Sequence, residues 1–379
     1  MKILLINPPA YTPTTYPYSL AAMKTELAFR LNEKICVLDL NASYHFEKFH
    51  EYYKRLRENP KQYFELLEEF SNKVKENGIQ ISKEMRLDQE IPEIKQLTEG
   101  IIKEEPTVVA ISLSYNSQIF VAKQLIDRIK KENSNIKIII GGPADYSKIL
   151  EGVKSLPSAK EFTKYLVSIG AKEKETSDGI KLLADFSDFN KDHYFTTDVV
   201  YPLRTSIACP YKLCTFCTHH GNTNFKLFDL STLKETIQNN NINKICFIDD
   251  DIPVIRIKQI AKILKNLNVK WWCQLRPTKQ IQSVLGEVVE SGLTSVAWGV
   301  ESGNQRILDL MKKGTKVEDV EATLKYAKTL GIQNMLYIMF GFPTETKEEF
   351  EDTTDFLGNN KEFIDCISPS IFGLQFGRV

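Results

Sequence analysis

Three of the seven cysteines in the chain lie within nine positions, at Cys209, Cys214 and Cys217, and the others are scattered. In a reducing compartment, a cluster of this kind indicates metal or redox chemistry rather than a disulfide framework. Three thiolates on one short loop can bind three irons of a four-iron cluster. No fourth cysteine lies near in the sequence, so one iron is left open to an external ligand. The spacing therefore predicts a catalytic iron site.

A second interpretation of the cluster is a single zinc ion held by the three cysteines with His219 or His220. Thiolate and imidazole ligands suit zinc well, and such a site would make the chain a non-enzymatic interaction protein. Two histidines in tandem point to different faces, however, and the strand-then-loop context is not that of a zinc knuckle. Cys246 and Cys273 lie within expected strands, and we interpret them as buried apolar residues.

The cysteine loop follows the first of six short apolar segments that alternate with helical patterns in the second half of the chain. We expect strands at residues 203–207, 245–248, 270–273, 295–300, 335–339 and 366–371. Strands that alternate with helices form a parallel sheet, and six of them predict a partial (β/α)6 barrel with its chemistry at the carboxyl ends of the strands. We assign residues 202–379 to this domain. Because the chain stops just after the sixth strand, a domain that is truncated at its C-terminus is the alternative to a complete one.

The first 150 residues alternate in the same way. Short runs rich in Ile and Val predict strands at residues 3–6, 35–38, 108–113 and 136–140, with a helical pattern between the last two. Such runs fit strands that are buried on both faces of a parallel sheet. The sequence therefore predicts an α/β, doubly wound, Rossmann-like domain at residues 1–150, followed by a polar linker at residues 151–201.

An insertion rich in charge and aromatic residues occupies residues 44–102 of this domain. The spacing of its aromatic residues places many of them on one helix face: Phe46, Phe49, Tyr52, Tyr53, Phe64 and Phe70. We interpret this stripe as the core of a helical layer, and a lid that covers a substrate is the alternative.

Charge and hydropathy exclude several classes of protein. The 49 Lys and Arg residues balance the 49 Asp and Glu residues, so no net field draws the chain onto nucleic acid or an anionic membrane. The longest apolar runs are far shorter than the roughly 20 residues of a membrane-spanning helix. The first residues lack the apolar stretch of a signal peptide. We expect a cytoplasmic protein with no nucleic-acid or membrane partner.

The second half of the chain resembles the radical S-adenosylmethionine (SAM) superfamily. Its members bind a [4Fe–4S] cluster through three cysteines after the first barrel strand. The family usually has three residues between the first two cysteines, whereas this chain has four. The resemblance implies that Cys209, Cys214 and Cys217 bind the cluster and that Phe216 lies beside the adenine of SAM.

Four further segments match this superfamily in order, each at the end of an expected strand. The resemblance implies SAM-binding roles for six residues in them, namely Asp249, Asp250, Arg276, Glu301, Ser302 and Gly341. Aspartates suit the ammonium group of the methionine moiety, and an arginine suits its carboxylate or a substrate group. The glutamate and serine approach the ribose or the methionine moiety, and the glycine segment packs on the adenine. The ordinary alternatives are a solvated turn for the aspartates and a surface ion pair for the arginine.

The first half resembles the cobalamin-binding domain of one large branch of the superfamily. The matching residues follow expected strands and are Asn7, Pro8, Ser112, Ser114, Gly141 and Gly142. An open α/β sheet binds its ligand at this edge, where glycines allow close backbone approach and serines can hydrogen-bond a nucleotide-like tail. The chain lacks an Asp-x-His-x-x-Gly motif and the Gly-Glu-Gly-Glu-like segment after a fifth strand. A degenerate first domain that recognises substrate without cobalamin therefore stays open.

The resemblance also implies a reaction. An electron from the cluster cleaves SAM to a 5'-deoxyadenosyl radical, and cobalamin would carry a methyl group to an unactivated carbon. The implied cofactors are a [4Fe–4S] cluster, SAM and cobalamin. The implied partners are a small-molecule or peptide substrate and an electron donor such as flavodoxin or ferredoxin.

Overall fold

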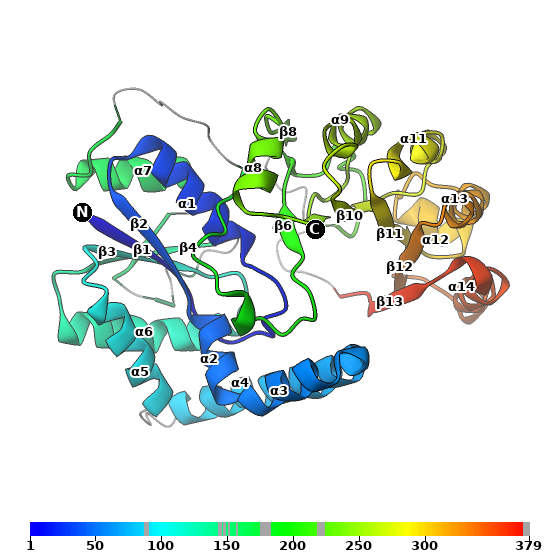
Figure 1. Ribbon diagram of the computed structural model, residues 1–379. Helices are drawn as coiled ribbons and strands as arrows, with labels where there is room; N and C mark the ends of the chain where they lie inside the picture. Colours follow the sequence, from blue (N-terminus) through cyan, green and yellow to red (C-terminus); the bar gives the residue numbers. More distant parts are fainter. Residues whose placement is uncertain are drawn as a thin grey trace. The chain divides into compact units, whose positions relative to one another are not determined.

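The structure is a computed structural model that describes residues 1–86, 91–142, 146, 149–150, 152–156, 158–174, 183–217 and 224–373. The chain divides into two compact units, Met1–Val200 and Tyr201–Val379 (Figure 1). Each unit is built on its own parallel sheet.

The first unit contains a five-stranded parallel sheet in the order β2-β1-β3-β4-β5. Its strands are β1 (Lys2–Asn7), β2 (Lys34–Asp39), β3 (Val108–Ser112), β4 (Lys137–Gly141) and β5 (Lys154–Ser155). The inner strand β1 alternates between two cores: Ile3 and Leu5 belong to one, and Leu4 and Ile6 to the other. A strand buried on both faces has to be apolar throughout, which explains the continuous run in the sequence.

Helices cover both faces of this sheet (Figure 1). The helices α1 (Tyr18–Arg30) and α7 (Ala159–Ser168) pack on one face, and α5 (Pro92–Lys103) and α6 (Gln118–Glu132) pack on the other. This arrangement confirms the expected doubly wound α/β fold. Its ligand-binding edge is the one at which β1, β2, β3 and β4 end.

The insertion predicted at residues 44–102 is helical. It contains α2 (Leu40–Lys48), α3 (His50–Glu58), a 3₁₀ turn (Pro60–Gln62), α4 (Tyr63–Arg86) and α5. Tyr53 and Phe70 are buried in one cluster, with Phe46, Phe49 and Tyr52 packed against them. These five aromatic residues are therefore core, as their spacing indicates. The sixth, Phe64, is 81% exposed.

The linker expected at residues 151–201 needs correction, because much of it belongs to the first unit. Strand β5 pairs with β4, and helix α7 buries Phe162 and Leu166 in the core shared with β1. Further along, the Asp188 carboxylate accepts a hydrogen bond from the Val37 backbone N–H at 2.9 Å and lies 2.8 Å from Lys24 Nζ. A two-residue strand and a single short amphipathic helix give a weak periodic signal, so composition alone indicated a linker.

The second unit contains a six-stranded parallel sheet in the order β13-β12-β11-β10-β9-β6. Its strands are β6 (Tyr201–Leu203), β9 (Lys244–Phe247), β10 (Lys270–Leu275), β11 (Leu293–Glu301), β12 (Gln333–Phe340) and β13 (Cys366–Ile371). The sheet stays open between β13 and β6, which is the partial barrel that was expected. The first expected strand is divided, because β7 (Ser206–Ile207) leaves the sheet and pairs antiparallel with β8 (Lys226–Leu227).

Helices follow the strands of this sheet and lie on one side of it (Figure 1). They are α8 (Leu233–Asn239), α9 (Val254–Leu264), α10 (Lys279–Gln282), α11 (Leu285–Val289), α12 (Gln305–Leu310), α13 (Val317–Thr329) and α14 (Lys347–Asn359). On β12, Asn334, Leu336 and Ile338 are buried, while Met335 and Tyr337 between them are only partly buried. The Asn334 amide donates to the Leu324 carbonyl of α13 at 3.0 Å, so the buried set faces the helices. Among the described residues, no helix is long and apolar enough to cross a membrane.

Candidate functional site

The cysteine loop begins two residues after β7 and carries three thiols. Cys214 is buried, Cys209 and Cys217 are partly buried, and none of the three forms a disulfide. Within the described residues, no three His, Cys, Asp or Glu side chains meet at a point where one metal ion would bind. A four-iron cluster requires no such point, because each cysteine binds a different iron. The donor set therefore fits the cluster expected from the sequence.

Hydrogen bonds hold this loop against the connection between α12 and α13. The Thr215 backbone N–H donates to the Met311 carbonyl at 2.9 Å, and its hydroxyl donates to the Leu310 carbonyl at 3.1 Å. The Tyr211 hydroxyl donates to the Lys312 carbonyl at 2.9 Å. A Cβ at Gly314, where φ is +68°, would lie 2.2 Å from the Tyr211 hydroxyl, so glycine is needed for this contact. The loop is thus fixed in place by a segment about 100 residues away in sequence.

Two cations lie beside the cysteine loop. The Arg276 guanidinium lies 3.6 Å from the centre of the Tyr211 ring, and Lys313 Nζ lies 5.8 Å from the centre of the Phe216 ring. Burial raises the pKa of the Cys214 thiol, and both cations oppose this effect. Positive charge favours the thiolate form that binds iron. The site can therefore hold an anionic cluster.

Each of these cations is anchored by a carboxylate. Arg276 Nε donates to Asp251 Oδ2 at 3.1 Å, and Lys313 Nζ donates to Glu301 Oε1 at 2.8 Å in a buried ion pair. The pairs are linked, because Arg276 Nη1 also donates to the Lys313 carbonyl at 3.2 Å. Charges held in this way need no reorganisation when a ligand arrives.

The three aspartates after β9 have different partners. Asp249 is buried and accepts hydrogen bonds from the Thr205 backbone N–H at 3.0 Å and from the Thr205 and Ser206 hydroxyls. Its carboxylate is thus used to hold the chain between β6 and the cysteine loop. Asp250 lies 3.5 Å from Arg204 Nη2 and is partly buried. The structure therefore does not give Asp249 and Asp250 equivalent surroundings.

The strand β11 ends in the segment Glu301, Ser302 and Gly303. Glu301 is buried and adopts φ +70°, a conformation that a residue with a side chain reaches only with strain. The buried Ser302 hydroxyl is hydrogen-bonded to the Thr353 hydroxyl of α14 at 3.0 Å. A Cβ at Gly303 would lie 2.6 Å from Phe356 Cβ of α14, so this glycine is explained by helix packing.

Two glycines open space at the ends of β11 and β12. A Cβ at Gly299 would lie 2.8 Å from Lys313 Nζ and 3.2 Å from Glu301 Oε1, so this glycine makes room for the ion pair. Gly341 adopts φ +73°, and its N–H donates to the Glu345 carboxylate. The turn after β12 is therefore closed by the chain itself.

In the first unit, the strand ends meet in a buried hydrogen-bond network. Asn7, predicted to bind a cofactor, is 2% exposed; its amide donates to Asp39 Oδ1 and to the Tyr11 hydroxyl, both at 2.8 Å. The Tyr194 hydroxyl donates to Asp39 Oδ2 at 2.6 Å. The Gln118 amide donates to Asn7 Oδ1 at 2.9 Å and to the carbonyl of the buried Pro8 at 2.8 Å. Desolvation of its carboxylate raises the pKa of Asp39, although its hydrogen-bond donors oppose this effect.

The remaining predicted residues of this edge are more accessible. Ser112 is partly buried and shares a 3.2 Å hydrogen bond with Ser19, and Ser114 is exposed. A Cβ at Gly142, where φ is +141°, would lie 1.9 Å from the Leu113 carbonyl oxygen. The close approach at Gly142 is therefore made to the neighbouring strand end. Gly141 lies beside it in β4 and accepts a hydrogen bond from the Leu113 N–H at 2.8 Å.

Several of these residues were missed in the sequence. Gln118 and Tyr194 lie 111 and 155 residues from their partners Asn7 and Asp39. Lys313 is 12 residues from Glu301 and Tyr11 is four residues from Asn7, but neither belongs to a motif. The one usable signal is the pair Lys313-Gly314 just after an amphipathic pattern, which marks a helix end near the loop. His219 and His220 of the zinc interpretation, and Pro143 after the two glycines, lie outside the described residues.

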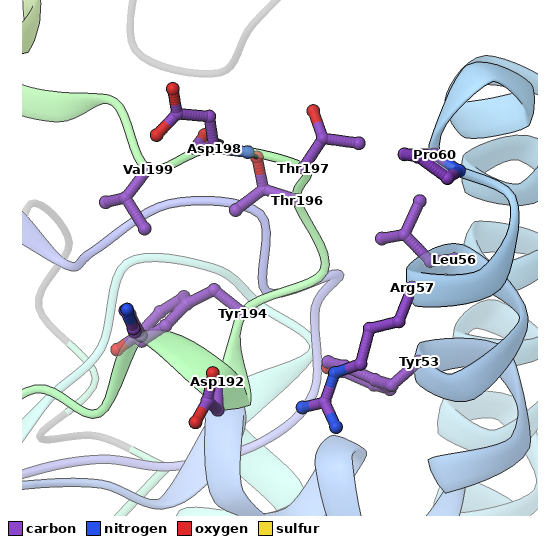
Figure 2. A pocket seen from close by; sticks show the side chains of 11 residues that line it. Tyr53, Leu56, Arg57, Pro60, Asp192, Tyr194, Thr196, Thr197, Asp198 and Val199 are labelled. Atoms are coloured by element: carbon purple, nitrogen blue, oxygen red, sulfur yellow. Dashed lines mark hydrogen bonds between the residues drawn. The ribbon is translucent and has the colours of Figure 1, made fainter.

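A separate hollow of about 390 Å³ lies in the first unit between α3 and residues 191–199 (Figure 2). Tyr53 and Leu56 form an apolar part of its wall, and Arg57, Lys191 and Asp192 give it charges of both signs. The Tyr53 hydroxyl donates to the His193 carbonyl at 3.1 Å. This tyrosine thus holds the chain at His193 against α3.

Comparison with known proteins identifies both units. Residues 203–357 match the Radical SAM superfamily, and residues 73–153 match the B12 binding domain. The chain is 29% identical over 165 residues to an uncharacterized methyltransferase of Pyrococcus horikoshii, which covers 40% of this chain and 35% of the relative. The chain thus spans about a third of the length of this curated relative.

Two solved structures share the fold of nearly the whole chain. The cobalamin-dependent S-adenosylmethionine radical enzyme OxsB matches with a TM-score of 0.66 at 15% identity, over 94% of this chain and 51% of OxsB. The radical S-adenosylmethionine methyltransferase TsrM from Kitasatospora setae matches with a TM-score of 0.64 at 14% identity, over 98% of this chain and 74% of TsrM. At such identities the likeness shows the fold.

The two family matches confirm the three cofactors expected from the sequence, a [4Fe–4S] cluster, SAM and cobalamin. They argue against the two alternatives raised from the sequence, a zinc-binding interaction protein and a degenerate first domain that binds no cobalamin. A radical SAM domain and a B12-binding domain occur here in one chain, each with its own sheet. This pair of domains confirms the resemblance to radical SAM enzymes with a cobalamin-binding domain that the sequence indicates.

Proposed function

We propose that the protein is a cobalamin-dependent radical SAM enzyme that methylates an unactivated carbon of a small molecule. The observation that carries the proposal is the cysteine loop at the end of the parallel sheet, with three thiols that form no disulfide and two anchored cations, in a chain that also has a B12-binding domain. The similarity to an uncharacterized methyltransferase and to the fold of a radical SAM methyltransferase supports methylation as the outcome.

In this proposal, Cys209, Cys214 and Cys217 bind the cluster, and Arg276 and Lys313 balance its negative charge. When bound, the cluster and SAM supply a 5'-deoxyadenosyl radical, and cobalamin supplies the methyl group. The chain itself provides binding and orientation. The loop contacts with residues 310–314 keep the three thiols in place while the cofactors bind.

Residues around the loop bind SAM in the proposal. Phe216 and the segment at Gly341 contact the adenine, and Asp250 receives the methionine ammonium group. Arg276 and the Glu301–Lys313 pair lie beside the loop and suit the methionine carboxylate and the ribose hydroxyls.

Asp249 and Ser302 act as positioning residues, because their polar atoms are already bonded within the protein. Asp249 holds Thr205 and Ser206, and Ser302 holds α14 through Thr353. Each fixes a strand end next to a residue proposed to bind SAM.

Cobalamin binds at the carboxyl edge of the first sheet. Ser112, Ser114 and the backbone at Gly141 and Gly142 are proposed to contact it, since these groups lie at the accessible ends of β3 and β4. Asn7, with Pro8, is proposed to act through the buried network instead, by fixing the loop after β1. Support for this division comes from the burial of Asn7 and the exposure of Ser114.

The test is anaerobic reconstitution of the full chain with iron, sulfide and hydroxocobalamin, followed by desalting. We expect about four irons and one corrin per chain. With SAM and dithionite, the protein should form 5'-deoxyadenosine, and SAM with a deuterated methyl group should give deuterated methylcobalamin. A colourless protein that holds zinc and leaves SAM intact would contradict the proposal. Corrin-free protein that still cleaves SAM would remove cobalamin from it and keep the radical chemistry.

A further inference from the structure

The hollow between α3 and residues 191–199 has the size of a small-molecule site (Figure 2). Its volume of about 390 Å³ lies near the lower end of the roughly 300–1,000 Å³ that such sites occupy. Three of its lining residues are large and buried, namely Tyr53, Leu56 and Tyr194. They give the hollow an apolar part against which a small ligand can pack.

Hydrogen bonds fix the two walls of the hollow. The Tyr53 hydroxyl, from the wall formed by α3, donates to the His193 carbonyl of the opposite wall at 3.1 Å. The Tyr194 hydroxyl donates to Asp39 Oδ2 at 2.6 Å. Both tyrosines line the hollow, and their hydroxyl groups are already bonded within the protein. A site that is fixed before its ligand arrives loses little entropy on binding.

The charges that line the hollow cancel. Arg57 and Lys191 are cationic, whereas Asp192 and Asp198 are anionic, so the formal charge of the lining is zero. Such a lining gives no overall preference for an anion or for a cation, because each would meet like charge as well as opposite charge. It suits a ligand that is neutral overall and carries charges of both signs.

Two of these charged groups have no ionic partner. In the part of the chain that the structure describes, neither the Arg57 guanidinium nor the Asp192 carboxylate forms an ion pair or a hydrogen bond. The guanidinium lies 5.7 Å from the centre of the Phe46 ring, and Asp192 is bonded through its backbone N–H to Asn190 Oδ1 at 3.1 Å. Figure 2 shows the two residues on opposite walls, Arg57 on α3 and Asp192 on residues 191–199. Two unpaired opposite charges that line one hollow can be bridged by a molecule that carries both.

We propose that this hollow binds a small zwitterion, an α-amino acid with an apolar side chain. The Arg57 guanidinium, a planar fork of donors, binds the carboxylate of the ligand, and the Asp192 carboxylate binds its ammonium group. The side chain of the ligand packs on Tyr53 and Leu56, which removes apolar surface from water. Binding at this hollow requires neither the cluster nor turnover, so the inference is independent of the proposed function.

Ligands with a single charge fit the hollow less well. A monoanion leaves the Asp192 carboxylate without a partner beside it, and a monocation leaves the Arg57 guanidinium without one. A phosphate group would add further negative charge next to Asp192 and Asp198, which is unfavourable. The charges of the lining therefore favour a zwitterion over either kind of ion.

The experiment titrates the full chain with three probes that share the side chain of leucine. L-Leucine carries both charges at neutral pH, 4-methylpentanoate carries only the carboxylate, and 3-methylbutylamine carries only the ammonium group. Dissociation constants are measured by ligand-observed NMR for the parent chain, Arg57→Gln and Asp192→Asn. The matched controls are Lys54→Gln and Glu58→Gln, which remove exposed charges of either sign from α3 outside the hollow.

We expect the parent chain to bind leucine about fivefold more tightly than either singly charged probe, which is the gain from one more ion pair that stays partly solvated. Arg57→Gln should weaken the binding of leucine and 4-methylpentanoate about fivefold and leave that of 3-methylbutylamine within about twofold. Asp192→Asn should weaken the binding of leucine and 3-methylbutylamine about fivefold and leave that of 4-methylpentanoate within about twofold. The two controls should match the parent chain with all three probes.

The absence of saturable leucine binding, or leucine that binds no more tightly than one of its singly charged analogues, would overturn the zwitterion site. Losses that are the same for all three probes would also overturn it, because the substitutions would then act on the walls of the hollow as a whole. Equal losses in Arg57→Gln and Lys54→Gln would overturn it as well. Formation of 5'-deoxyadenosine is not part of the readout, so failure of this site and failure of the proposed function are distinguishable.

Discussion

The ligand-binding edges of the two sheets are built from different interactions. In the second unit, the cysteine loop is surrounded by charges that are paired with each other, Arg276 with Asp251 and Lys313 with Glu301. In the first unit, the strand ends are joined by amide and hydroxyl groups around one partly buried carboxylate, Asp39. The second edge is prepared for an anionic cofactor, whereas the first presents mainly fixed backbone. Polar residues after parallel strands can thus serve either purpose, and the partners decide which.

The difference can be measured separately in each unit. All three tryptophans, Trp271, Trp272 and Trp298, lie in the second unit, so tryptophan fluorescence reports its unfolding. Retained cobalamin reports on the first. Each prediction below changes one edge and asks whether the other responds.

The largest effect is expected from Cys214→Ala. Removal of one thiolate should abolish 5'-deoxyadenosine formation and lower the iron content, because two cysteines cannot hold the cluster. Cobalamin retention should be unchanged, since the first edge does not depend on the loop. Iron analysis and product quantification test this, with the exposed Cys366→Ala as control. Activity in Cys214→Ala would show that other thiols bind the cluster.

The next effect is expected from Lys313→Met. Breaking a buried ion pair leaves the Glu301 carboxylate without its partner and should destabilise the second unit by about 3–5 kcal/mol. Urea unfolding followed by tryptophan fluorescence measures this. Lys313→Met combined with Glu301→Gln should recover much of the loss. Lys279→Met, which breaks an exposed pair with Asp319, should change stability by about 1 kcal/mol or less. Equal effects of the two lysine variants would refute the buried pair.

A third effect is expected at Gly142 in the first edge. In Gly142→Ala the new Cβ meets the Leu113 carbonyl oxygen at a position with φ +141°, which should destabilise the first unit by about 2 kcal/mol or more. Cobalamin retention should fall, and iron content should not. Gly100→Ala, in helix α5 with open space at its Cβ, is the control and should not destabilise. Full corrin retention in Gly142→Ala would argue against this account of the edge.

The smallest effect concerns the pH dependence at Asp39. Because burial raises the pKa of Asp39 in the folded chain, the folded state binds more protons than the unfolded state above about pH 4. The stability of the first unit should therefore fall as pH rises from about 4 through the folded pKa and then level off. Asp39→Asn should remove this slope. Urea unfolding read by corrin release at several pH values tests it. An unchanged slope in Asp39→Asn would assign the titration to another group.

The sequence predicts strands and the cysteine loop well, because both depend on local patterns. Apolar runs such as residues 108–113 and the three closely spaced cysteines need no knowledge of distant partners. The roles of Asp249 and Asn7 could not be obtained in the same way. Their burial depends on Ser206 and Gln118, which the fold brings in from 43 and 111 residues away. Motif position identifies the edge, and only the three-dimensional partners show which side chains are free to bind.

Residues 154–168 show the opposite limit. Strand β5 has two residues and pairs at one edge of the sheet, so its sequence carries almost no alternation. Helix α7 depends on packing against α1 and β1 for its burial. Tertiary contacts therefore decide the end of the first unit, and composition indicates only a polar stretch.

The missing side chain at Gly299 links three positions in the evolution of this protein. The space it leaves is filled by the end of Lys313 on its way to Glu301. A lineage that gains any larger residue at position 299 has to shift the end of Lys313, which weakens its contact with the carboxylate at 301. Homologues should therefore keep these three residues together or replace them together. An alignment would show this as covariation among positions 299, 301 and 313, which no single motif contains.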